Sequence, residues 1–206
     1  MALTGPFSVC AGDARSGTDH LSPEEGPFEG YRTGQHDKRQ ENITRLTSFI
    51  DLQSDLSVLI ELPAAYTYIT VKKSDAGAIE IHSASCPNEG AWKNPTKFEK
   101  TLPAELFENI ALLWKTELLE TSYLNGVEIP VSDSPYYHFS CVVRNGSLSG
   151  STVIGGPSEN RPHLRKLADA ALLLHSYTEE KDATKQAEIL IELRKTLKGT
   201  KKTKRH

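Results

Sequence analysis

The sequence has few cysteines and no long apolar run. Its 206 residues include three cysteines, Cys10, Cys86 and Cys141. An odd and sparse set of cysteines is not a disulfide framework and is typical of a reducing compartment. No segment approaches the roughly 20 apolar residues that a membrane-spanning helix needs. We therefore expect a cytoplasmic protein without a transmembrane segment.

The N-terminus lacks the basic start and the apolar stretch of a secretory signal peptide. An alternative exists at residues 7–12, FSVCAG, which loosely resemble a bacterial lipoprotein cleavage site. Val9 departs from that pattern, because a small residue is expected there. If the natural start lies upstream, Cys10 would be a lipid anchor and the protein would be membrane-attached.

The sequence also lacks a strong charge of either sign and lacks cofactor motifs. The net charge is −3, which implies no global attraction to nucleic acid or to a membrane. The one basic cluster is the KKTKR segment at 201–205, which we interpret as a solvated tail. Neither a phosphate-binding loop nor a dinucleotide-binding glycine pattern is present, so no cofactor is expected.

Composition divides the chain into four parts. Residues 1–42 are rich in Gly, Pro, Ser, Asp and Glu and show no apolar period, so we expect disorder there. An α+β domain is expected over 43–178. A separate C-terminal helix is expected over 179–198, followed by the basic tail at 199–206.

Alternating apolar residues predict strands in the first half of the domain. Leu56, Val58 and Ile60 alternate, and a hairpin follows, in which YTYITVKK and GAIEIHS are joined by a turn at SDAG. One face of this hairpin is apolar and the other carries Tyr68, Thr70, Lys72, Glu80 and His82. The proline-rich stretch at 86–103 is expected to be a loop, with Trp92 as a packed anchor.

Helical periodicity appears in three segments. They begin near Pro103, near Pro162 and near Ala183, and each has apolar residues at intervals of three and four. Runs of strands separated by one helix favour an α+β fold. We expect an antiparallel sheet of four or five strands, two helices packed on one face, and an additional C-terminal helix.

Asn145-Gly146 is a strong hairpin signal, because both residues suit a turn that needs positive φ. This turn would place Cys141 opposite Gly150 and Phe139 opposite Thr152. Tyr137, Phe139, Cys141 and Val143 would then share an apolar face. The polar face would carry Tyr136, His138, Ser140 and Arg144 among others.

The hairpin register argues against catalysis and against a metal site. His138 and Cys141 are three positions apart, so a regular strand places them on opposite faces. They would form neither a Cys-His pair nor, with His82 and Cys86, a zinc tetrahedron. His138 and Ser140 share a face, but no nucleophile elbow is present. We therefore expect neither catalytic nor metal-binding residues.

The remaining functional candidate is a recognition surface. If the two hairpins join one sheet, their polar faces coincide, and Tyr, His and Arg are favoured at such surfaces. We expect a protein partner there, as for an immunity-type or adaptor protein. The alternative is a hydrolase-like enzyme whose site is assembled from His, Tyr, Glu and Arg on the same face. The candidate partner-binding residues are Tyr68, Glu80, His82, Trp92, Tyr136, His138, Ser140 and Arg144.

Overall fold

The computed structural model describes residues 22–23, 36–48, 50, 54–62, 64–87, 95–121, 135–144, 146–153 and 162–198. Three features discussed above lie outside these residues: Cys10, Trp92 and the basic tail at 199–206. No helix among the described residues is long and apolar enough to cross a membrane.

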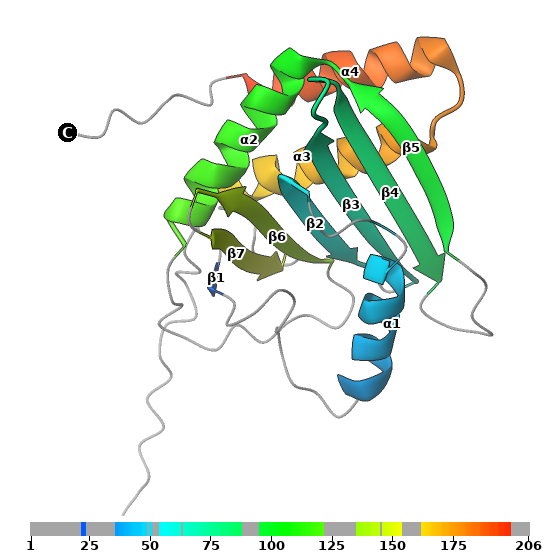
Figure 1. Cartoon of the computed structure of the whole chain (residues 1–206), viewed down its shortest axis with the longest axis vertical. Helices are drawn as coiled ribbons and strands as arrows, with labels where there is room; N and C mark the ends of the chain where they lie inside the picture. Colours follow the sequence, from blue (N-terminus) through cyan, green and yellow to red (C-terminus); the bar gives the residue numbers. More distant parts are fainter. Residues whose placement is uncertain are drawn as a thin grey trace, which may run out of the picture.

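The fold is α+β, as the sequence predicted, and it is built around one antiparallel sheet (Figure 1). The strands lie side by side in the order β1-β7-β6-β2-β3-β4-β5. β1 has only two residues, so six longer strands make up the sheet, more than the four or five expected. Their bounds are β1 Ser22–Pro23, β2 Leu56–Glu61, β3 Ala65–Lys73, β4 Ile79–Pro87, β5 Thr96–Leu102, β6 Tyr136–Val143 and β7 Gly146–Val153.

β5 is the strand that the sequence analysis missed, since residues 86–103 were expected to form a loop. It pairs along its whole length with β4, from Leu102 opposite Ile79 to Thr96 opposite Ser85. Its sequence, TKFEKTL, has only two apolar residues, because it is an edge strand on which Lys97 and Glu99 are exposed to solvent. Lys100 fastens it to a helix by donating to the backbone oxygens of Tyr177 and Glu180.

Four helices cover the two faces of the sheet unequally. α2 (Ala104–Leu119) and α3 (Pro162–Glu179) pack on one face, and α4 (Ala183–Leu197) packs on α3 and α2. α1 (His36–Ser48) lies on the opposite face, against β3 and β4 (Figure 1). The sequence predicted the three later helices but left residues 42–53, NITRLTSFIDLQ, ambiguous between a short helix and a strand. α1 also begins at His36, so it crosses the boundary expected near residue 43.

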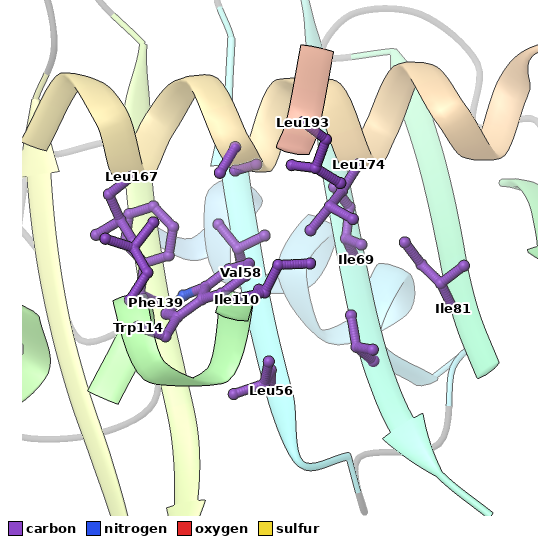
Figure 2. Close-up of a cluster of buried hydrophobic side chains, with 14 of the residues drawn as sticks. Leu56, Val58, Ile69, Ile81, Ile110, Trp114, Phe139, Leu167, Leu174 and Leu193 are labelled. Atoms are coloured by element: carbon purple, nitrogen blue, oxygen red, sulfur yellow. The ribbon is translucent and has the colours of Figure 1, made fainter. Parts of the chain in front are cut away.

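The main core lies between the sheet and the helices α2, α3 and α4 (Figure 2). Trp114 of α2 packs edge-on against Phe139 of β6, with ring centroids 5.4 Å apart. Leu167 and Leu174 of α3 and Leu193 of α4 complete the cluster from above the strands. An aromatic pair of this geometry adds to the free energy gained by burying its area.

A second and smaller core lies under α1. It is formed by Ile43, Leu46 and Ile50 together with sheet residues from the other face, which are Leu59, Tyr66, Tyr68, Ala84 and Cys86. This cluster explains why the sequence of β2 is almost continuously apolar: Val58 and Ile60 face the main core, and Leu59 faces α1. A strand buried on both faces loses the simple alternation of a half-exposed strand.

The β6–β7 hairpin forms, but its register differs from the expected one by two residues. Cys141 lies opposite Leu148 and Phe139 opposite Gly150. Val143 opposite Gly146 closes the ladder, so Gly146 belongs to β7 instead of the turn. A shift of two residues preserves the side-chain faces, because side chains alternate with period two. Tyr137, Phe139 and Cys141 are accordingly buried in the main core, as predicted.

Candidate functional site

The face of the sheet that α1 partly covers, here called the α1 face, contains the candidate residues. Its strand registers define rows of side chains that cross the sheet. One row carries a polar residue on each of the six longer strands: Glu99, His82, Thr70, Ser57, Ser140 and Ser149. The next row holds Lys97, Ala84, Tyr68, Leu59, His138 and Ser151. The middle of this second row, formed by Ala84, Tyr68 and Leu59, belongs to the second core under α1.

The accessible side chains of the first row and its neighbours make up a surface that we call the polar platform. It is interrupted where Ser57 of β2 and Thr70 of β3 are buried. Its accessible members are half-buried or exposed side chains of β3, β4, β5, β6 and β7, together with the exposed Arg144 that follows β6: Lys72, Glu80, His82, Glu99, Thr101, Ser140, Val142, Arg144, Ser147 and Ser149. Val142 is its one large apolar residue and is 59% exposed. The platform therefore offers mixed charge around a single exposed apolar side chain, whereas the opposite face is covered by helices.

His82 lies between two carboxylates on the platform. Its Nε2 is 3.7 Å from Glu80 and its Nδ1 is 3.8 Å from Glu99. Both distances exceed those of a hydrogen bond, so neither carboxylate fixes the ring orientation. The side chain of Glu99 is 60% exposed, which leaves this part of the platform open to a partner.

Hydroxyl groups join the central strands beneath the platform. The Ser57 and Ser140 hydroxyls are 3.0 Å apart across β2 and β6. Tyr68 hydrogen-bonds Ser57 from β3, but burial dominates and raises the pKa of the Tyr68 phenol. Pairing these hydroxyls satisfies polar groups that would otherwise be costly to bury.

His138 forms a buried pair with Glu61 next to this network. The His138 Nε2 and a Glu61 carboxylate oxygen are in hydrogen-bonding contact, and His138 is only 1% exposed. Tyr136 stacks on the His138 ring with centroids 6.3 Å apart. A carboxylate that orients a histidine is half of a catalytic triad, which also requires a nucleophile within reach of the ring.

Two of the nearby nucleophiles are directed away from His138. Ser140 bonds Ser57, and Cys141 points into the main core on the opposite side of the sheet from His138. Burial raises the pKa of the Cys141 and Cys86 thiols, which disfavours the reactive thiolate in both. Ser151 lies opposite His138 on the same face, and the His138–Glu61 pair joins β6 to β2 by a hydrogen bond.

Among the described residues, no three His, Cys, Asp or Glu side chains are grouped so that they could hold a metal ion. A shallow, open depression lies instead at the junction of α3 and α4, lined by Ser176, Glu179, Glu180, Lys181 and Ile189. Its wall includes neither His82 nor His138, so this hollow brings none of the candidate residues together.

The structure separates the eight candidate residues into three groups. Four of them lie on the platform: Glu80, His82, Ser140 and Arg144. Half-buried Tyr136 lies two residues before His138 in the sequence, on the same face of the sheet. Tyr68 and His138 were expected on the open face, but each is only 1% exposed. The Tyr68 phenol ring and the His138 imidazole ring are enclosed beside Leu59. The polar atoms of these two side chains had suggested exposed positions. Trp92 lies outside the described residues.

Sequence reasoning missed Glu99, Thr101, Lys97 and Glu61. The first three belong to β5, which was taken for a loop, so its face could not be assigned. Glu61 follows an apolar run and precedes Leu62-Pro63, which marked it only as the end of a strand. Alternation within TKFEKTL was the available signal for β5.

The fold and the platform define an α+β protein whose sheet is covered by helices on one face and only partly on the other. Comparisons of this chain with protein-family models, with curated proteins and with solved structures found no match.

Proposed function

We propose that the protein is a non-catalytic binding module, of the immunity or adaptor kind, that recognises another protein through the polar platform. The observation that carries this proposal is the unequal covering of the sheet. Helices α2, α3 and α4 bury one face, while on the other face exposed or half-buried polar residues occur on both sides of the buried Ser57 and Thr70. A surface with mixed charge around one exposed apolar side chain, Val142, suits protein recognition better than small-molecule binding.

The enzyme alternative has less support from the same residues. A catalytic site needs a concave region that excludes water and brings a base to a reacting group. The best-oriented base on this face, His138, is enclosed with Glu61, and the platform histidine, His82, lies between carboxylates beyond hydrogen-bond distance. The serine nearest to His138 in sequence on this face, Ser140, hydrogen-bonds Ser57.

The proposal is tested by reversing the character of the platform at two accessible positions. The double variant Glu99→Lys/Val142→Glu changes β5 and β6, where both side chains are more than half exposed. The purified wild-type chain is used to capture partners from extract of its native cells, which are identified by quantitative mass spectrometry. The matched control is Glu188→Lys, an exposed charge reversal on α4.

We expect a specific partner to be captured by the wild type and by the control, and its recovery to fall at least about tenfold with the double variant. Loss of about 1.4 kcal/mol of binding free energy corresponds to this factor. Circular dichroism and urea unfolding establish that the variant is folded. Equal recovery with the double variant would exclude the platform as the binding surface.

A further inference from the structure

The two edges of the sheet differ in how they are protected. β5 forms one edge and carries Lys97, Glu99 and Lys100 within seven residues. Charged side chains, lysine above all, discourage another strand from pairing with an edge. β7 lies near the other edge, and its sequence GSLSGSTV has neither a charge nor a proline. An uncharged strand rich in serine and glycine leaves its outer edge open to pairing.

The outer edge of β7 is occupied over two residues by β1. Ser22 lies opposite Ser151, and Pro23 lies opposite Gly150, in antiparallel register. Among the described residues, these two positions of β7 are the only ones paired on that side. Pro23 has no N–H to donate, so β1 cannot form a full ladder. The structure thus shows that this edge accepts an antiparallel strand, and that the strand now there is held by few bonds.

We propose that the outer edge of β7 binds an extended segment of a partner protein as an added antiparallel strand, and that β1 occupies this site in the free protein. This inference rests on the proposed function and names the form of the partner. Strand addition gains affinity from backbone hydrogen bonds and specificity from alternate side chains. The partner segment must displace β1 before it pairs with the full length of β7.

The side chains beside the edge define the chemistry of the partner segment. On the α1 face, β7 presents the hydroxyl groups of Ser147, Ser149 and Ser151. On the other face it presents Leu148, which packs on the main core. The C-terminal end of α2 lies beside β6 and β7 (Figure 1), and its last residue, Leu119, is 47% exposed. A segment that alternates small polar with aliphatic side chains fits both sides.

β1 competes for the edge because it belongs to the same chain. A tethered segment has an effective concentration on the order of millimolar, so even a short strand weakens the binding of a free peptide. Disrupting β1 removes this competition without changing β7. Ser22→Pro is suitable, because it removes the one backbone N–H that β1 can donate.

The test uses the full-length chain labelled with 15N and a synthetic peptide of alternating leucine and threonine with lysine at both ends. Peptide is titrated into the wild type, into Ser22→Pro, and into Ser16→Pro as a matched control outside β1. We expect Ser22→Pro to bind the peptide at least about tenfold more tightly than either other protein, consistent with removing a tethered competitor. The amide shifts should change in β7, between Gly146 and Val153.

Several results would overturn the inference. Equal peptide affinity in all three proteins, no binding to any of them, or shifts confined to β5 would each do so. Dimerisation of Ser22→Pro without peptide would assign the edge to a second copy of this chain instead.

Capture of a partner that depends on the platform but is unchanged by Ser22→Pro would exclude the edge and leave the platform function standing. Tighter peptide binding by Ser22→Pro, together with capture of a partner that does not depend on the platform, would support the edge and exclude the platform as the binding surface.

Discussion

At the scale of single residues, His175 is the side chain whose ionisation is most clearly tied to folding. It lies on α3 with its Nδ1 3.5 Å from the Ser83 hydroxyl and its Nε2 3.5 Å from the Glu179 carboxylate. Burial lowers the pKa of His175 from its ordinary value of 6.5, and the Glu179 charge opposes this only in part. The folded protein therefore favours the neutral imidazole.

Protonation of His175 should destabilise the protein in mild acid. Because the pKa is lower in the folded chain, the unfolded chain binds more protons once the pH falls below the ordinary value of 6.5. The stability linked to neutral His175 is present above that value and is lost as the pH falls through the folded pKa. Urea unfolding of the wild type and of His175→Gln at about pH 7.5 and about pH 5.5 tests this, since those pH values lie on either side of the ordinary value of 6.5.

We expect the free energy of unfolding to decrease less between these two pH values in His175→Gln than in the wild type. The comparison is a difference of differences, so any constant effect of the substitution on packing cancels. An equal decrease in both proteins would show that groups other than His175 carry the acid sensitivity of this region.

At the scale of secondary structure, the predictable elements are those with one apolar face. α2, α3 and α4 have apolar residues at helical spacing, and β3 and β4 alternate on either side of the turn at Gly77, whose φ is +83°. β5 escaped prediction because its charges protect an edge, which removes the apolar signal that strand prediction uses. The β6–β7 turn was placed one residue too late, at 145–146 instead of 144–145, and this displaces every cross-strand partner by two residues.

α4 was expected to be an addition to the domain, but it contributes to the main core through Leu193 and Leu197. Leu193 is fully buried, whereas Ile191, two positions away, is 51% exposed. Leu193→Ala should lower the free energy of unfolding by roughly 2–5 kcal/mol, because it leaves a cavity between α4, α3 and the sheet.

Urea unfolding of Leu193→Ala and Ile191→Ala provides the matched comparison on one helix. Removing the exposed Ile191 side chain should change the free energy of unfolding by no more than about 0.5 kcal/mol. Similar values for the two variants would mean that α4 is not part of the core.

At the scale of the whole molecule, two cores of unequal size share one sheet. The main cluster joins α2, α3 and α4 to the sheet, while the second joins only α1 to it. Sequence periodicity predicted the first cluster but placed Tyr68 and His138 on an open surface. Side-chain polarity cannot reveal that a helix from before the sheet covers the middle of its other face. The sequence accordingly assigned Glu80, His82 and Ser140 to the correct face of the sheet, while their role in binding stays a prediction.

The small cluster should open before the large one. α1 is held mainly by Ile43, Leu46 and Ile50, so its release exposes little apolar surface and need not disrupt the main core. We expect native-state hydrogen exchange to give a lower opening free energy for the amides of Glu41–Ser48 than for the centre of α3. Equal values would show that the two cores unfold together.

A substitution in each core separates the two openings. Leu167→Ala, in the main core, should lower the opening free energy of α3 amides by roughly 2–5 kcal/mol and leave that of α1 unchanged. Its counterpart Leu46→Ala destabilises the state in which both cores are intact, so it should lower both values. A loss of protection in α1 upon Leu167→Ala would contradict independent opening.

The position of β2 at the centre of the sheet also determines when the fold can be completed. β2 to β5 pair with their neighbours in sequence, but β2 reaches its second partner, β6, across a wide gap, as in Ser57 and Ser140, 83 residues apart. Pairings between distant segments form slowly because a long loop must close first. In a chain that is still being synthesised, one backbone edge of the apolar strand β2 therefore stays unpaired until β6 has left the ribosome. We expect misassembly to be most frequent at this stage.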